Sequence, residues 1–210
     1  MRLAIFGGTG KTGKPLVEQA LAQGYDVTAL VRTPSKLPIE SPSLTLVQGD
    51  ATDPMDVDRV IIGADAVLSA LGHVKGSPDN VQTVATEHII KAMKRRGVKR
   101  FVSLTGAGVE DPNDEPKFAD KVIRFLLKTF AGKVLEDAKN HAEVLRQHKD
   151  IDWVMVRGPR LTNGAHTGEY RVGYVGKNSS TQISHADTAD FMLKQVTDDT
   201  YVHEAPVVSY

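Results

Sequence analysis

Hydrophobic residues along the chain follow two alternating patterns: short unbroken runs, and longer stretches in which they recur every three or four positions. The short runs contain almost no polar alternation, which is typical of strands buried on both faces of a parallel sheet. Six such strands are expected, at RLAIF (2–6), DVTALV (26–31), LTLVQ (44–48), AVLSA (66–70), RFVSL (100–104) and DWVMV (152–156).

The longer stretches predict amphipathic helices that cross over between the strands. Residues 11–24 place four apolar side chains on one helical face, and Gly24 suits the C-cap. Residues 80–97 repeat this pattern and end on lysine, arginine and glycine, as a helix C-terminus does. Right-handed crossovers of this kind build a Rossmann-like, doubly wound α/β sheet that is mostly parallel, has helices on both faces, and binds ligands beyond the carboxyl ends of its strands.

Length and composition limit the expected partners. With 210 residues, of which 40% are hydrophobic, the chain is expected to form one domain over residues 1–210. Its 26 basic and 26 acidic residues cancel, so no net field draws it to nucleic acid or to an anionic membrane, and small molecules are the expected partners. There is no cysteine to form a disulfide, bind a metal or act as a nucleophile. A monomer or a weak homodimer is expected.

The distribution of apolar residues also bears on localisation. No apolar stretch approaches the roughly 20 residues that span a membrane. The apolar run LAIF begins at Leu3, which leaves no room for the charged start of a secretory signal. The sequence therefore predicts a cytoplasmic protein without a membrane partner.

The glycine-rich stretch AIFGGTGKTG, at the end of the first strand, raises a choice between a triphosphate-binding loop and a dinucleotide-binding loop. A triphosphate loop reads G-x-x-x-x-G-K-[ST], and neither register fits, because isoleucine replaces the first glycine in one and proline replaces the hydroxyl residue in the other. Gly7, Gly10 and Gly13 instead follow a strand and open a helix, a variant of the dinucleotide fingerprint with its first spacing lengthened by one. A purely structural turn is the alternative interpretation.

The second strand bears on the choice of dinucleotide. An NAD site usually offers an acidic residue to the ribose 2′-hydroxyl, whereas an NADP site offers arginine to the 2′-phosphate. Here Arg32 stands at that position with Lys36 nearby, and no acidic residue occurs between Arg32 and Glu40. This pattern favours NADPH, although a solvated loop of basic residues is the alternative. Asp50 in QGDAT follows the third strand, where it can meet the adenine amine.

Seven short segments occur over nearly the whole chain in an order and spacing typical of one family. They are AIFGGTGKTG, GYDVTALVRTPSKLP, VQGDATDPMDVD, GADAVLSALG, AMKRRGVKRFV, HTGEYRV and ISHADTADFML. In these segments the chain resembles the atypical short-chain dehydrogenases, and more narrowly the flavin reductases of the biliverdin-IXβ reductase group. The resemblance implies an NADPH-dependent reductase with a broad, shallow, hydrophobic site that accepts open-chain tetrapyrroles and flavins such as FMN.

The resemblance also assigns residues to the cofactor. Those that match the phosphate-binding loop of the family are Gly7, Thr9, Gly10, Lys11, Thr12 and Gly13. Arg32 and Lys36 match its contacts with the 2′-phosphate. Residues that follow later strands complete the expected cofactor site, and they are Asp50, Ala51, Leu71, Gly72 and, near the nicotinamide, Thr105.

Two positions near the expected acceptor depart from the family pattern. Gly106 stands where the related enzyme has a serine after its threonine, and Arg160 replaces a histidine. Thr105 and Arg160 are the candidate catalytic residues, Thr105 to position the nicotinamide and Arg160 to offer charge to a flavin phosphate or a propionate. The Tyr-x-x-x-Lys pair of typical short-chain dehydrogenases is absent because Leu135 precedes Lys139, so carbonyl chemistry is not expected.

Two charged or metal-binding features receive ordinary explanations. Residues 91–100 carry six basic side chains, which we interpret as cations that complement the dipole of a helix C-terminus rather than as a nucleic-acid patch. His141 and His148 lie seven positions apart, without a carboxylate or third histidine at ligand spacing. No metal is expected.

Two further segments bear on the acceptor end of the site. Residues 108–133 combine a polar, proline-broken loop with an amphipathic stretch, which is expected either to form part of the acceptor pocket or to pack in the core or at a dimer surface. Its apolar residues are Phe118, Val122, Phe125, Leu126 and Phe130. In ISHADTAD, Ser184 and Asp187 are expected to cap a helix, and a catalytic role for His185 is disfavoured.

The sequence therefore supports an NADPH-dependent oxidoreductase that transfers hydride to a flavin or bilin-type acceptor. Reduction of a flavin or quinone needs little from the protein beyond alignment of nicotinamide and acceptor, so the missing tyrosine does not exclude it. A quinone reductase and a non-catalytic NADP(H)-sensing regulator are the alternatives.

Overall fold

The computed structural model describes residues 1–74, 76–118, 120, 122, 129 and 131–210. Its centre is an eight-stranded sheet in the order β3-β2-β1-β4-β5-β6-β10-β8, parallel throughout except between β10 and β8. The strands are β1 (Arg2–Phe6), β2 (Asp26–Val31), β3 (Leu44–Gln48), β4 (Ala66–Ser69), β5 (Arg100–Gly106), β6 (Asp152–Gly158), β8 (Arg171–Gly173) and β10 (Val207–Ser209). A separate parallel pair joins β7 (Arg160–Thr162) to β9 (Gln182–Ser184).

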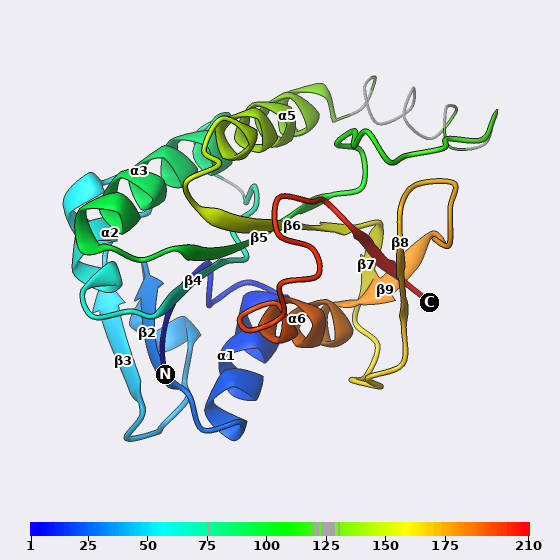
Figure 1. Ribbon diagram of the computed structural model, residues 1–210. Helices are drawn as coiled ribbons and strands as arrows, with labels where there is room; N and C mark the ends of the chain where they lie inside the picture. The colour runs from blue at the N-terminus through cyan, green and yellow to red at the C-terminus, as the bar shows by residue number, and fades with distance from the viewer. Residues whose placement is uncertain (75, 119, 121, 123–128, 130) are drawn as a thin grey trace.

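Helices cover both faces of the large sheet (Figure 1). On one face α2 (Pro54–Ile61) packs against α3 (Val81–Arg96), which packs against α5 (Gly132–Arg146). On the other face α1 (Gly13–Ala22) packs against α6 (His185–Lys194). A short 3₁₀ helix, η1 (Pro34–Lys36), follows β2. The arrangement is the doubly wound, Rossmann-like α/β fold that the alternating pattern predicts.

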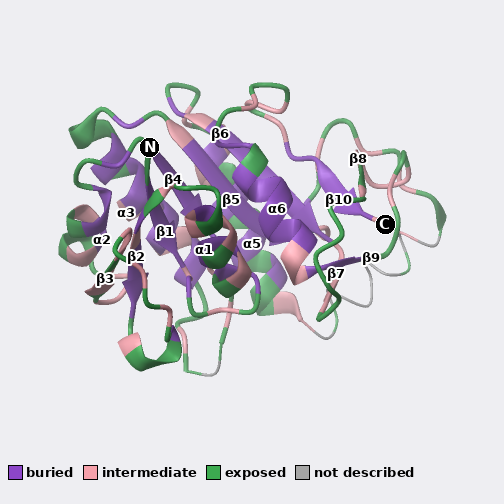
Figure 2. Cartoon of the chain, turned by 90° about the horizontal axis from the view of Figure 1, so that it is seen from below, coloured by how far each residue is buried: buried purple, intermediate pink, exposed green. Residues whose placement is uncertain are grey.

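Two hydrophobic clusters lie on opposite faces of the sheet, and Figure 2 shows the buried central strands between the helices. Alternate side chains of one strand supply the two clusters, since Phe6 packs with α2 and α3 whereas Ile5 packs with α1 and α6. This two-sided burial explains why the sequence shows unbroken apolar runs instead of alternation.

The predicted strands and helices are confirmed, with differences at their ends. β5 and β6 each continue two residues beyond the expected run, to Gly106 and Gly158. α3 ends where predicted, at Gly97, whose φ of +72° places it in the left-handed region that favours glycine. β3 corrects the expectation of burial on both faces, because it lies at the sheet edge and its side chains are only partly buried or exposed.

The basic segment 91–100 pairs with carboxylates of neighbouring segments. Asp58 on α2 accepts hydrogen bonds from both Arg95 and Arg96, and Lys94 lies 2.9 Å from Asp150. These ion pairs link α3 to α2 and to the turn after α5. The structure thus gives the basic side chains partners within the chain.

Candidate functional site

The glycine-rich loop turns the chain from β1 into α1 against the end of β4. A Cβ on Gly7, which has a φ of +78°, would lie 2.7 Å from the backbone of Ala70. A Cβ on Gly13 would lie 2.0 Å from the carbonyl oxygen of Gly7. Both glycines are therefore required for the close packing of the turn itself.

Gly10 differs from these two glycines. A Cβ there would meet only the Gly7 carbonyl oxygen, at 3.2 Å, and the residue faces a groove at the carboxyl ends of β1 to β4. The open face of Gly10 is the surface on which a ligand can approach the backbone at the start of α1. The backbone at Gly10, the middle glycine, is therefore open to a ligand, as the dinucleotide fingerprint requires.

The groove brings together eight of the residues that the sequence assigns to a cofactor. Those residues are Gly7, Thr9, Gly10, Arg32, Asp50, Ala51, Leu71 and Gly72. Leu30, Val74, Pro78 and Val81 add apolar surface. They come from four separate strand ends, which meet only because the strands are parallel and adjacent.

Five of the assigned residues do not line the groove, and their positions differ. The Thr12 hydroxyl lies 2.8 Å from Nδ1 of His185, and Gly13 is packed against Gly7. Lys11 is exposed beside the loop, and Lys36 is exposed on η1. Thr105 lies at the end of β5, toward the second cavity described below.

The charged groups of the groove are a free cation and a fixed anion. The Arg32 guanidinium is exposed and has no hydrogen-bonded or ion-paired partner among the described residues. Asp50 accepts hydrogen bonds from the backbone nitrogen (2.9 Å) and hydroxyl (2.7 Å) of Thr52. The Thr52 amide, its hydroxyl and the charge of Arg32 hold the pKa of Asp50 below its usual value. The groove therefore offers a cation to a phosphate and an anion to an amine.

A second cavity, of about 510 Å³, opens at the carboxyl ends of β5 and β6. Its floor is mostly backbone, because small residues end both strands and follow them: Gly106, Ala107, Gly108, Gly158 and Pro159. Arg160, exposed at the start of β7, and the segment Ser179–Gln182 complete the walls. The volume is that of a small-molecule site.

Thr105 lies immediately before this floor. The residue is 5% exposed, and its Oγ1 is buried without a hydrogen-bond partner among the described residues. A buried hydroxyl without a partner is costly, and this one belongs to the residue just before the cavity floor. Together with the open face of Gly10, it makes the carboxyl edge fit a dinucleotide that extends from the groove toward the cavity.

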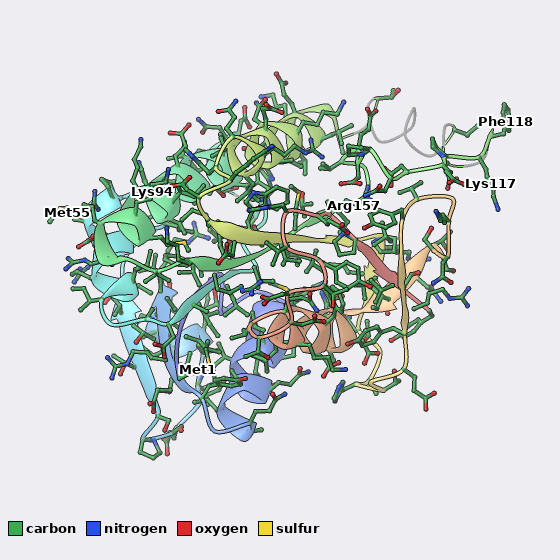
Figure 3. All side chains as sticks on the ribbon, viewed as in Figure 1. Met1, Met55, Lys94, Lys117, Phe118 and Arg157 are labelled. Atoms are coloured by element: carbon green, nitrogen blue, oxygen red, sulfur yellow. The ribbon has the colours of Figure 1, made fainter. Side chains whose placement is uncertain are left out.

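A buried ion pair holds the outer wall of the cavity. Arg157 on β6 is fully buried and donates to both carboxylate oxygens of Asp114, at 2.9 and 2.7 Å (Figure 3). It also donates to the carbonyl oxygens of Val109 and Ala205. Val175, which lines the cavity, donates its N–H to Asp114 at 3.0 Å. Arg157 therefore ties β6 to the loop after β5 and to the segment before β10, and Asp114 ties the same loop to Val175.

The segment 108–133 contributes to the cavity through Asp120. Phe118 is 82% exposed and stands at the tip of the segment, away from the body of the molecule, and Val122 is also exposed (Figure 3). The remaining apolar residues of the expected amphipathic face lie outside the described residues, and they are Phe125, Leu126 and Phe130. Phe118 and Val122 do not pack in the core, so the prediction of core packing is wrong for these two residues.

α5 carries a polar residue that the sequence analysis missed. Asp137 is 2% exposed and accepts hydrogen bonds from the backbone nitrogens of Gln82 (2.9 Å) and Thr83 (3.0 Å), so it caps the start of α3 from another helix. Nε2 of His73, next to the groove, lies 3.2 Å from the same carboxylate. The only sequence signal was one acidic residue on an apolar helix face, which a pattern cannot connect to its partners.

The tyrosine–lysine pair of typical short-chain dehydrogenases is absent from this helix. Leu135 is buried, and Lys139 is exposed on the outer surface of α5. The residues described as lining the two cavities thus present hydroxyl, guanidinium and backbone groups, and no tyrosine is among them.

The start of α6 confirms the predicted caps. The Ser184 hydroxyl accepts a hydrogen bond from the backbone nitrogen of Asp187 at 2.9 Å. The Asp187 carboxylate in turn fixes Thr167 and Tyr210, at 2.9 and 2.6 Å.

The described residues contain no cluster of three or more histidine, aspartate or glutamate side chains that could hold a metal ion. Within the same residues, no helix is both long and apolar enough to cross a bilayer.

The fold and the groove define a Rossmann-like nucleotide-binding protein. The model of the NAD(P)H-binding family matches residues 7–199, and the chain belongs to that family. An uncharacterized chloroplastic protein of Arabidopsis thaliana is 31% identical over 176 residues; this match covers 80% of the chain but 61% of the longer relative. The family assignment confirms a dinucleotide loop over a triphosphate loop.

Solved structures share the fold at low sequence identity. A short-chain dehydrogenase/reductase from Veillonella parvula, in complex with NADP, aligns with a TM-score of 0.81 and 17% identity, covering 100% of this chain and 94% of that one. ChuY, described as an anaerobillin reductase from Escherichia coli O157:H7, aligns with a TM-score of 0.79 and 19% identity, covering 100% and 97%. At this level of identity the likenesses show a common fold.

Proposed function

We propose that the chain is an NADPH-dependent oxidoreductase that delivers a hydride to a planar acceptor, a flavin or an open-chain tetrapyrrole. The observation that carries this proposal is the pair of adjoining sites along one sheet edge, the groove at β1 to β4 and the 510 Å³ cavity at β5 and β6. We treat residues 1–210 as one domain that bears both. The bilin class is supported by the fold shared with ChuY.

The preference for NADPH rests on Arg32. Its guanidinium lies in the groove without a hydrogen-bonded or ion-paired partner in the part of the chain that the structure describes, and no acidic residue stands in its place to bind a ribose hydroxyl. Gly10 and the N-terminus of α1 would hold the pyrophosphate, and Asp50 would accept the adenine amine. Lys36 and Lys11 are exposed nearby and add positive potential to this end of the molecule.

Each group at the acceptor end has a task. A bound nicotinamide cofactor would supply the hydride, and a flavin acceptor would take its proton from solvent, which the open cavity admits. Thr105 uses its free hydroxyl to fix the nicotinamide ring. Arg160 attracts an anionic substituent of the acceptor, and the small residues of the floor leave room for a flat ring system. No general acid on the protein is required.

The test is oxidation of NADPH by the purified protein with FMN, riboflavin, a bilin and a quinone as separate acceptors. FMN and riboflavin share the reacting ring and differ by a phosphate, so Arg160→Ala should raise KM about tenfold or more for FMN and leave KM for riboflavin unchanged. Lys177→Ala, a change at an exposed lysine away from the cavity floor, is the matched control.

The acceptor profile separates the alternatives. Turnover with a quinone but with neither flavin nor bilin would contradict the proposed acceptor and indicate a quinone reductase. Tight binding of NADPH without turnover on any of the four acceptors would contradict an enzyme and support an NADP(H)-sensing regulator instead.

A further inference from the structure

Thr12 and His185 form a contact between the glycine-rich loop and α6. Nδ1 of His185 lies 2.8 Å from the Thr12 hydroxyl, which is 5% exposed at the start of α1. Gln19 on α1 donates to the carbonyl oxygen of Ala186 at 2.9 Å, so the first turn of α6 is fixed beside the loop. His185 itself is only partly buried.

The surrounding charges determine the protonation of the ring in the free protein. Burial and the positive charge of Lys11 lower the pKa of His185 below its usual value, so the ring is neutral near pH 7. On α6 itself the Asp187 carboxylate is engaged by Ser184, Thr167 and Tyr210. Gln19, where α1 meets α6 beside the ring, is uncharged.

The number of protons in the contact has a consequence for ligand binding. The Thr12 hydroxyl has one hydrogen, which it donates to Nδ1 when the ring is neutral and Nδ1 is the acceptor. An anionic phosphate at the start of α1 would compete for that hydrogen. If the hydroxyl turns to the phosphate, Nδ1 must become the donor to the hydroxyl oxygen, either by protonation of the ring or by a change of tautomer.

We propose that His185 is a further cofactor-binding residue, and that Thr12 and His185 couple the binding of the dinucleotide to the uptake of a proton. The inference rests on the proposed function, because its ligand is NADPH. The negative charge of the bound phosphates favours the protonated ring of His185. The protonated ring then adds a second positive charge beside that of Lys11. As pH rises through the pKa of the bound state, this contribution is lost and affinity falls, by up to about tenfold per pH unit for one linked proton.

Calorimetric titration with NADPH, in buffers of different ionisation enthalpy, measures the protons taken up directly. His185→Asn keeps an amide near Nδ1 that can donate to Thr12 but cannot titrate, and Thr12→Val keeps the shape of residue 12 but removes its hydroxyl. Both variants should take up fewer protons than the wild type. His148→Asn, at a partly buried histidine beside Lys94 just after α5, should match the wild type.

The 2′-phosphate of NADPH also titrates, with a pKa of about 6 by analogy with other phosphomonoesters, so each titration is repeated with NADH. The proposal predicts that the difference in proton uptake between wild type and His185→Asn persists with NADH. Equal uptake by the two proteins would overturn it and indicate a change of tautomer. Failure of the wild type to bind NADPH would instead overturn the proposed function, so the two failures are distinguishable.

Discussion

At the scale of single residues, charge in the cofactor groove is concentrated on Arg32 and Asp50. Asp50 is held by Thr52, whereas the Arg32 guanidinium has no internal partner among the described residues. A cation that is not held in a hydrogen bond or ion pair is available to a ligand without the cost of breaking one. Arg32 is therefore the residue at which the choice between the two nicotinamide dinucleotides can be tested.

Arg32→Ala should weaken NADPH binding about 10- to 100-fold, the usual effect of losing a hydrogen bond to a charged group, and should change NADH binding little. Fluorescence titration with both dinucleotides measures the two constants. Lys14→Ala, which removes an exposed cation from the neighbouring α1, serves as the control. Equal losses of NADPH and NADH affinity would contradict the proposed contact between Arg32 and the 2′-phosphate.

His141 gives a prediction about pH. The ring is fully buried, with hydrogen-bond partners Thr86 and Ser103, and burial lowers its pKa to about 4. The unfolded chain binds a proton at this residue below about pH 6.5 and the folded chain does not, so its stabilising contribution is present above that pH and is lost as pH falls toward 4.

His141→Gln should therefore reduce the acid sensitivity of folding. Between pH 7 and about pH 4.5, the free energy of unfolding of the wild type should fall by about 2 kcal/mol more than that of the variant. Urea denaturation at both pH values measures the difference, with His148→Gln, at a partly exposed histidine, as the control. Parallel pH dependence of wild type and variant would contradict the assignment.

At the scale of elements, the β1–loop–α1 unit contains glycines of two kinds. A Cβ at Gly13 would lie 2.0 Å from the Gly7 carbonyl oxygen, whereas a Cβ at Gly10 would lie 3.2 Å from its nearest atom and enter the groove. Gly13→Ala should lower the melting temperature strongly. Gly10→Ala should fold with nearly unchanged stability and lose dinucleotide affinity. Thermal melts combined with NADPH titration test both, and intact NADPH affinity in folded Gly10→Ala would refute the groove as the binding site.

Most central elements were predictable because each depends on a local pattern. Buried parallel strands read as unbroken apolar runs, and β1, β2, β4, β5 and β6 were found in this way. α2 was missed although Asp53 caps it and Pro54 opens it, because its eight residues are too few for a clear period. β7 to β10 are three residues each, which is shorter than any alternation can reveal.

The groove was more predictable than the supports around it. A fingerprint names Gly7, Gly10 and Arg32 because a ligand imposes their spacing along the chain. Asp137 caps a helix more than fifty positions away, and Arg157 reads only as the continuation of a strand. Contacts of this kind depend on tertiary packing, which no local pattern records.

At the scale of the whole molecule, Arg157 and Asp114 connect the end of the sheet to the loops around the acceptor cavity. Burial raises the pKa of Asp114, but the hydrogen bonds and charge of Arg157 outweigh this effect and leave it lowered. The carboxylate is therefore ionised at neutral pH. Its contribution to stability is present above the unfolded pKa of about 4 and is lost as pH falls further.

Asp114→Asn should leave Arg157 buried without a counterion and destabilise the fold by about 3 kcal/mol. Because the pair supports the acceptor wall and lies away from the groove, the variant should raise KM for the acceptor while NADPH affinity stays unchanged. Equilibrium denaturation and steady-state kinetics measure the two effects. A loss of NADPH affinity without a change in acceptor KM would contradict this division of the sheet edge.

A titration of the purified wild-type protein with NADPH, NADH and ATP in parallel tests most directly whether the groove binds NADPH. A groove built by the dinucleotide fingerprint and completed by Arg32 predicts saturable binding of NADPH, about tenfold or more weaker binding of NADH, and no comparable affinity for ATP with magnesium. Tight binding of ATP without binding of either dinucleotide would contradict a dinucleotide-binding groove, because the glycine-rich loop would then hold a triphosphate.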